Sequence, residues 1–142
     1  MIQSIIDGII KAIRTKYDKS YRVYTESIEQ GLIEPCFSIL CLNPSGEREI
    51  SNRFKRFYPF MITYFPSTDE PVIECNSVCE ELMDVLNDIE TDNGVLHGSD
   101  LSGNIVDGVL HFQVKYNTFV MSVDKSEDGM DDITIGTTRV KG

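Results

Sequence analysis

The sequence predicts an α+β fold, in which a mainly antiparallel five-stranded sheet carries two packed helices. Two segments, residues 2–17 and 71–89, repeat apolar residues at intervals of three and four, as amphipathic helices do. The segments between and after them alternate apolar and polar residues, or are rich in β-branched and aromatic residues, as strands are. The predicted order is one helix, three strands, a second helix and a two-stranded hairpin.

The first helix is predicted from a stripe of isoleucines. They are Ile2, Ile5, Ile6, Ile9, Ile10 and Ile13. Gly8 interrupts this segment and costs about 1 kcal/mol relative to alanine in a helix interior. The continuous apolar stripe outweighs that cost, so we expect the helix to form by packing against the sheet.

Three strands are predicted between the helices. Residues 21–25 form a short strand, and residues 36–42 are largely apolar on both faces, which is typical of a central strand covered on both sides. A turn at residues 43–46 leads into a long strand within residues 48–65, because proline and glycine favour turn geometry. Pro59 cannot donate a ladder hydrogen bond, which predicts an edge position or a bulge.

The second helix begins at Pro71, a residue suited to the first helical position. Its buried stripe is opposed by a polar and mostly acidic one, made of Glu74, Ser77, Glu81, Asp84 and Asp88. The segment contains no lysine or arginine, so ion pairs along the helix contribute nothing to its stability. Packing must hold this helix in place.

Asp107 and Gly108 carry the strongest local signal in the chain. An Asp-Gly pair between two β-like runs indicates a tight hairpin with a type I′ turn. The flanking strands are predicted at residues 101–106 and 109–123. Three glycines, at positions 94, 98 and 103, mark a flexible stretch.

Charge is segregated along the chain. Residues 57–114 contain eleven acidic residues and no lysine or arginine, within a net charge of −10 for 142 residues. This balance argues against non-specific nucleic-acid binding, which depends on cationic contacts to phosphate. No apolar run is long enough for a membrane helix, and the start does not resemble a signal peptide, so we expect a cytoplasmic protein. Residues 1–123 are expected to form one domain, followed by an acidic tail, residues 124–142, that is partly flexible or adds a short edge strand.

The sequence gives no reason to expect an enzyme, a cofactor or a metal site. His97 and His111 are the two histidines, and no nucleophile elbow, phosphate-binding loop or metalloprotease motif is present. Cys75 and Cys79 lie four apart on the apolar side of the second helix. Small buried hydrophobic residues explain them better than a metal pair does, and without a secretion signal disulfides are not expected.

Several segments together resemble a family of phage and prophage tail terminator proteins from siphophage-like elements of Gram-positive bacteria. They are residues 29–37 (EQGLIEPCF), 42–44 (LNP), 53–66 (RFKRFYPFMITYFP), 74–76 (ECN), 106–112 (VDGVLHF) and Tyr116. None of these pieces is a catalytic motif, and their order and joint presence carry the resemblance. It covers most of the chain, about residues 1–123, and leaves out the tail.

The resemblance implies structural work in the assembly of a virus particle. Proteins of this family look like ring-forming caps, with six copies as the family expectation. They bind the last ring of the tail tube, stop its growth and present a surface to the head connector protein. The implied partners are therefore further copies of the chain, the tail tube protein and the head connector protein, with no membrane and no sequence-specific nucleic acid. The implied locations are the cytoplasm of the bacterial host during assembly and then the virion tail at the head–tail junction.

A ring requires a different contact patch on each side of the subunit, and the segregated charge supplies two complementary ones. The residues predicted to lie at subunit or partner contacts are Arg48, Arg53, Lys55, Arg56, Phe57, Met61, Glu81, Asp84 and Asp88. Exposed ion pairs contribute only about 0–1 kcal/mol each, so apolar contacts at Phe57 or Met61 must carry most of the binding. The acidic residues of this set are candidates for the complementary face or for a lumen through which DNA passes.

Other functions remain open at this level. A head completion or connector protein of the same particle has a similar size and fold. A small enzyme that uses acidic residues, or a regulatory protein that binds other proteins, also fits the composition. The basic run at residues 48–56 is interleaved with aromatic residues, a pattern that also suits phosphate binding or base stacking.

Overall fold

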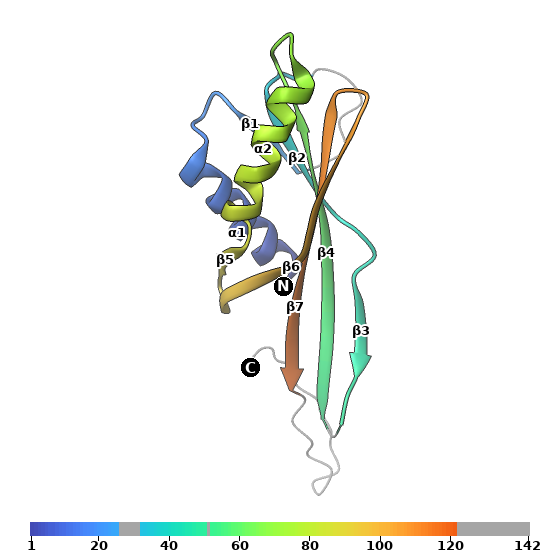
Figure 1. Ribbon diagram of the computed structural model, residues 1–142. Coiled ribbons are helices and arrows are strands. Elements are labelled where there is room, and N and C mark those ends of the chain that lie inside the picture. Colours follow the sequence, from blue (N-terminus) through green and yellow to red (C-terminus); the bar gives the residue numbers. More distant parts are fainter. Residues whose placement is uncertain (26–31, 51, 122–142) are drawn as a thin grey trace, which may run out of the picture.

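A computed structural model of the chain describes residues 1–25, 32–50 and 52–121, so the predicted tail lies outside the described residues. The predicted α+β class is confirmed. Two helices lie on one face of a twisted sheet, and β5 and the start of β6 turn under them (Figure 1). In order, the elements are α1 (Ile2–Lys16), β1 (Arg22–Tyr24), β2 (Cys36–Cys41), β3 (Ser45–Arg48), β4 (Arg53–Phe65), α2 (Pro71–Val85), β5 (Asp88–Thr91), β6 (Gly94–Val106) and β7 (Val109–Met121).

The sheet has seven strands in the described part of the chain, not the five predicted. Their order is β1-β2-β4-β7-β6-β5, and β3 pairs with β4 beyond the end of β2. Strands β1 and β2 are parallel, and the other paired strands are antiparallel, so the sheet is mixed. The two additional strands, β3 and β5, both come from segments that the sequence assigned to other structures.

Strand β3 occupies part of the predicted turn. Ser45 and Gly46 pair with Phe57 and Arg56 instead of forming the turn that was predicted at residues 43–46. The chain reverses later, and the Glu49 N–H donates to the Arg53 carbonyl to close the hairpin. All four residues of β3 are exposed, so no apolar alternation marks this strand in the sequence.

The second helix ends at Val85, four residues earlier than predicted. Asp88 therefore does not extend the acidic stripe of α2 but begins β5. Ile89 is buried in β5, and it also fits the apolar stripe of the predicted helix. Its apolar character therefore did not distinguish a helix from a strand. The neglected signal is the Asn93-Gly94 pair. Residues 92 and 93 connect β5 to β6, and Gly94, the first residue of β6, has a φ of 104°.

The predicted flexible glycine stretch is part of β6. Gly98 lies where a Cβ atom would come within 2.9 Å of the Leu86 carbonyl, and a Cβ at Gly103 would collide with the Cys79 sulfur. Gly103 therefore lets β6 approach α2 closely, and Gly98 lets it approach the segment that follows α2. The Asp107-Gly108 turn between β6 and β7 is confirmed, with positive φ at both residues (54° and 75°), as a type I′ turn requires.

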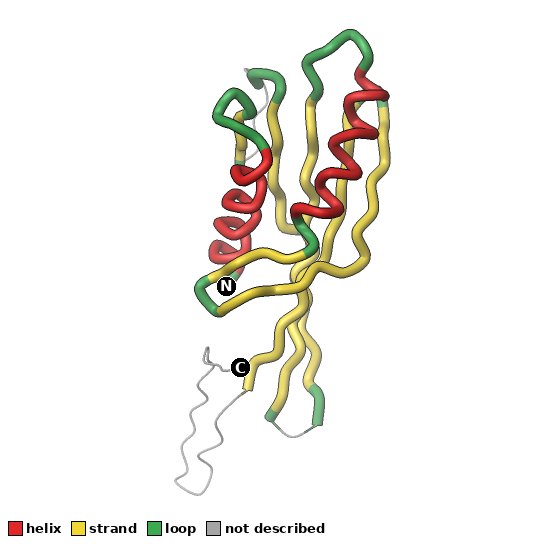
Figure 2. The backbone as a smooth tube through the Cα atoms, turned by 60° about the vertical axis from the view of Figure 1, so that its left-hand side comes forward, coloured by secondary structure: helices red, strands yellow, loops and turns green. Residues whose placement is uncertain are grey.

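The hydrophobic core fills the space between the helices and one face of the sheet. It includes Ile5, Ile9 and Ile13 of α1, Cys75, Val78 and Leu82 of α2, and the inward residues Phe37, Phe60, Ile62, Tyr64, Leu110, Phe112, Val114 and Tyr116 of β2, β4 and β7. No helix of the described part covers the opposite face (Figure 2). Leu40 of β2 is 55% exposed on this open face, so the prediction that β2 is covered on both sides is wrong at this end of the strand, whereas Cys36 on the same face is buried.

Pro59 lies at the point where β4 changes its neighbour from β2 to β3. Pairing with β2 ends at Phe60, and pairing with β3 begins at Phe57. The Pro59 carbonyl accepts a hydrogen bond from the Leu42 N–H. In an antiparallel strand the N–H and C=O of one residue point to the same side, so the side on which Pro59 lacks an N–H is the gap between β2 and β3. The strand is central because β7 pairs with its other edge, but the proline still avoids the cost of a lost ladder bond.

Gly8 allows α1 to lie directly against the backbone of β5. A Cβ at this position would lie 2.5 Å from the Glu90 carbonyl oxygen. We therefore expect Gly8→Ala to lower the free energy of unfolding by about 1–3 kcal/mol through overpacking, although alanine has the higher helix propensity. Urea denaturation measures this change. Lys16→Ala, an exposed change on the same helix, is the control, and a Gly8→Ala protein as stable as the control would contradict the close approach.

Candidate functional site

A three-stranded arm projects beyond the helices. It consists of β3, residues 49, 50 and 52 of the hairpin, residues 53–59 of β4 and residues 115–121 of β7, and this set is called the arm below. Figures 1 and 2 show these strands extending past the ends of both helices. At about 3.3 Å per residue, the seven residues from Arg53 to Pro59 reach roughly 20 Å from the body.

The open face of the arm combines aromatic rings with cations. The Arg53 guanidinium carbon lies 4.0 Å from the centre of the Phe119 ring. The Lys55 ammonium lies 5.3 Å from the Phe57 ring and 5.7 Å from the Phe119 ring. The Lys115 ammonium lies 5.9 Å from the centre of the Phe57 ring. Each of these cations is attracted to the face of a ring. Arg53 also lies 3.8 Å from the Glu49 carboxylate, and Lys115 lies 3.3 Å from the Asp100 carboxylate, so ring contacts and ion pairs hold the cluster together.

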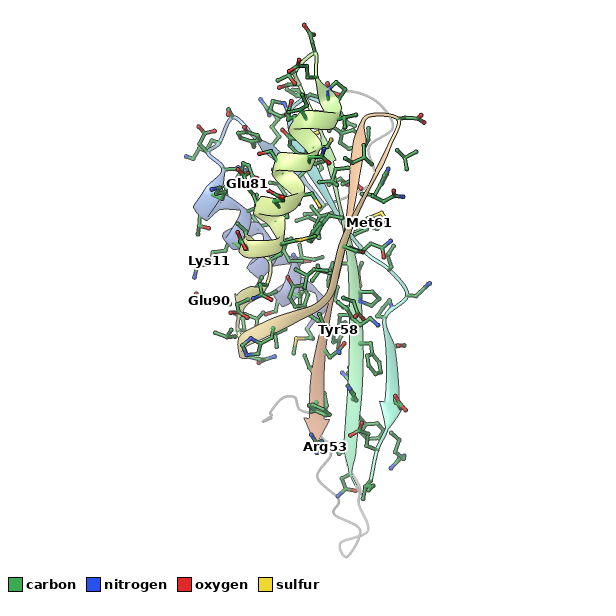
Figure 3. All side chains as sticks on the ribbon, in the orientation of Figure 1. Lys11, Arg53, Tyr58, Met61, Glu81 and Glu90 are labelled. Atoms are coloured by element: carbon green, nitrogen blue, oxygen red, sulfur yellow. The ribbon has the colours of Figure 1, made fainter. Side chains whose placement is uncertain are left out.

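The predicted basic residues are divided between the two faces of the arm. Arg53, Lys55, Phe57 and Met61 alternate along the open face of β4, and Figure 3 shows Arg53 near the free end with Met61 closer to the body. Arg56 points to the opposite face, together with Arg48, whose guanidinium lies 4.7 Å from the Phe54 ring on its own strand pair. Cations therefore lie on both faces of the hairpin. On the open face, Glu47 is opposite Lys55 and Glu49 lies beside Arg53.

The three predicted acidic residues do not form one surface. Glu81 is half-buried and accepts a hydrogen bond from the Tyr17 hydroxyl, which connects α2 to α1. Asp88 lies on β5, where its carboxylate is 2.6 Å from the Nδ1 atom of His97. Asp84 alone is exposed on the outer face of α2 without an ion pair among the described residues.

A second tyrosine–carboxylate pair anchors the start of α2 to the sheet. The Glu74 carboxylate accepts hydrogen bonds from the Tyr64 hydroxyl and from the backbone N–H of Thr68 at 3.1 Å. Burial alone would raise the pKa of Glu74, but these hydrogen bonds outweigh it and hold the pKa below its ordinary value. Burial and the adjacent carboxylates raise the pKa of the Tyr64 and Tyr17 hydroxyls. Part of the acidic stripe is thus structural and not a solvated face.

The arm and the body carry opposite charge. The arm holds five Lys or Arg residues and two Glu residues, a net charge of +3. The rest of the described chain holds fourteen acidic and five basic residues, a net charge of −9. A projecting basic element on an acidic body favours contact with an acidic protein surface.

The geometry offers little to a small ligand or a metal. Residues 1–25, 32–50 and 52–121 contain no group of three or more His, Cys, Asp or Glu side chains that could hold a metal ion. A shallow groove of about 220 Å³ lies between α1 and β5, and Lys11 and Glu90 form an exposed ion pair of 2.7 Å within it (Figure 3). Cys75 is buried, and burial raises the pKa of its thiol, which makes it a poor nucleophile.

Sequence reasoning missed three residues of the arm. Lys115 and Phe119 come from β7 and join the cluster through its register with β4. Ile50, at the turn between β3 and β4, is 87% exposed. In the sequence, Ile50 is a single apolar residue that follows the charged residues 47–49 and precedes Arg53. This pattern could have predicted an exposed apolar side chain.

The family model of the phage tail terminator proteins, described as "Phage tail terminator protein", matches residues 4–128. The chain belongs to this family. The match includes most of α1 and all of α2 and the strands, so it does not rest on one local motif. No curated protein matches the chain.

Family membership makes the chain a structural component of phage tail assembly, which interacts with other proteins of the particle. The resemblance noted in the sequence is confirmed at this level. None of the helices in the described part of the chain has the length and apolar character needed to cross a membrane.

Acid should selectively weaken the contact between Glu74 and the sheet. Because the folded-state pKa is lowered, the carboxylate stabilises the fold above about pH 4.5, and this contribution is lost as the pH falls through the folded pKa. We expect Glu74→Gln to reduce the free energy of unfolding by about 1 kcal/mol at neutral pH and by less in acid. Urea denaturation from pH 7 down to pH 3.5 measures the difference.

The control is Glu80→Gln, an exposed change on the same helix that breaks no hydrogen bond seen in the described structure. Its free energy of unfolding at neutral pH should stay close to that of the wild type. If the stability difference of Glu74→Gln stayed constant over the same range, the ionised carboxylate would not be the stabilising species.

Proposed function

We propose that the protein ends the growth of the tail tube by forming a ring on its last layer, and that the free side of this ring receives the head connector. The observation that carries the proposal is the family match over residues 4–128. The shape of the subunit supports it, because an arm on one side of a body gives two different contact surfaces. Such heterologous contacts generate closed rings when the rotation between subunits closes.

The proposal assigns the predicted contact residues to different tasks. Arg53, Lys55, Phe57 and Met61 on the open face contact another protein chain. Arg48 and Arg56, on the other face, are available to a further partner, either the tube protein or the connector. Asp84 contributes to an acidic contact, whereas Glu81 and Asp88 act within the subunit through Tyr17 and His97.

The charge distribution also supports passage of DNA. A terminator at the head–tail junction lies on the route of the genome, and a body of net charge −9 repels phosphate. A lumen lined by the body would therefore let DNA pass without holding it. The ring number follows the family expectation of six.

A tube-growth assay tests this function directly. Tail tube protein from the same phage or prophage is allowed to polymerise alone and with increasing amounts of the purified chain. We expect tubes to become shorter as the ratio of this chain to tube protein rises, with one ring visible at a tube end by negative-stain microscopy. Tubes of unchanged length with bare ends would refute capping. Binding to purified heads without binding to tubes would instead favour a head completion protein.

A further inference from the structure

We infer that the arm of one copy docks on the outer face of α2 of a second copy, with Ile50 and the cluster of Arg53, Lys55 and Phe119 as the contacting groups. This inference rests on the ring proposed above and names the two surfaces that meet in it. The outer face of α2 is defined by the exposed residues Val72, Ile73, Asn76, Ser77, Glu80, Met83 and Asp84.

The arm exposes apolar surface in a basic setting. Ile50 at its turn is 87% exposed, and Phe119 on its open face is 39% exposed. Arg53 and Lys55 lie beside Phe119, so aromatic and cationic groups form one continuous surface. Aromatic residues and arginine are the residue types that most often carry the binding energy of protein interfaces.

The outer face of α2 has the complementary properties. Val72 and Ile73 are 53% and 64% exposed at its start, and Met83 is 41% exposed near its end. Glu80 and Asp84 lie between and beside these residues, and neither takes part in an ion pair within the described part of the chain. The helix therefore presents apolar groups and uncompensated negative charge together.

The two surfaces agree in length. The rise from Ile73 to Asp84 along the helix is about 16 Å. The strand from Arg53 to Phe57 covers about 13 Å, and the turn that carries Ile50 extends it further. An arm laid along the helix can thus place its cations over Glu80 and Asp84 while Ile50 reaches the apolar end.

The acceptor must belong to another copy. Figure 1 shows the arm directed away from α2 of its own chain, past the far ends of the helices. Donor and acceptor surfaces are different parts of the subunit, so each copy can donate to one neighbour and accept from another. This arrangement is the heterologous contact that a ring needs.

Nucleic acid fits the arm less well than a protein surface. Bases stack on the open faces of aromatic rings, but Arg53 and the two lysines already occupy positions over Phe57 and Phe119. The body adds a net charge of −9 close to the arm, which repels phosphate. The same charge attracts the arm of a neighbour.

Charge reversal in the full chain tests the contact. The arm variant is Arg53→Glu with Lys55→Glu, and the helix variant is Glu80→Lys with Asp84→Lys. We expect each variant alone to associate about tenfold or more weakly than the wild type, because like charges meet at every junction. Sedimentation velocity over a range of concentrations measures association, and circular dichroism with thermal melting verifies that each variant folds.

Rescue makes the test specific. A chain with all four changes should recover association, since its arm is acidic and its helix basic. An equal mixture of the arm variant and the helix variant should also assemble, because each junction then joins opposite charges. The matched controls are Lys16→Glu with Lys19→Glu and Asp7→Lys with Asp92→Lys, which reverse exposed charges elsewhere on the body and should leave association unchanged.

The outcomes separate this inference from the function on which it rests. If rings still form in both reversed variants, the arm-to-helix contact is overturned and tube capping stays intact. The same conclusion holds if neither the chain with all four changes nor the mixture of the two variants recovers association. Arm reversal that abolishes binding to tail tubes but not self-association would assign the arm to the tube protein. Arm reversal that changes only DNA retention would assign it to nucleic acid, and a wild-type protein that stays monomeric with and without tubes would overturn both proposals.

Discussion

The pairing of β4 with β7 is the interaction on which the rest of the structure depends. It runs without interruption from Arg53 opposite Met121 to Tyr64 opposite Leu110. The part of this pair formed by residues 60–64 of β4 and 110–114 of β7 packs against the helices. It supplies the core residues Phe60, Ile62, Tyr64, Phe112 and Val114. The other part, residues 53–59 of β4 with residues 115–121 of β7, extends past the helices and forms the centre of the arm. One continuous strand pair thus joins the folded body to the surface proposed for assembly, and it fixes the orientation of that surface relative to the core.

The sequence predicted the elements whose patterns were unambiguous. The isoleucine stripe of α1 and the Asp107-Gly108 turn appear as expected, because each has one structural interpretation. The end of α2 could not be predicted in the same way. Ile89 is three residues beyond Leu86 and fits a helical stripe, but it also fits the short alternation of β5. Strand β3 was missed because an exposed strand that pairs only with β4 needs no apolar residues.

The candidate site was predictable in its charge and not in its arrangement. Segregation along the chain identified a basic hairpin and an acidic region, and the structure places these on the arm and the body. Strand alternation then separates Arg53 from Arg56, although both belong to one basic run. Lys115 and Phe119 complete the cluster through a strand register that the sequence does not specify. Glu81 and Asp88 belong to the acidic region, but their hydrogen bonds lie within the subunit.

No helix of the described part of the chain covers the arm, which raises the question of what keeps the arm ordered before it binds a partner. A narrow ribbon without such cover has little core of its own and is marginally stable in isolation. Here the ribbon continues β4 and β7 of the body, and cation–π contacts of about 0.5–1 kcal/mol each hold its open-face side chains. The arm is therefore ordered before any partner arrives, so a partner does not bear the entropy cost of ordering it. A preorganised arm suits a protein that must stop a polymer at one position, since it can engage a neighbouring copy without first folding on it.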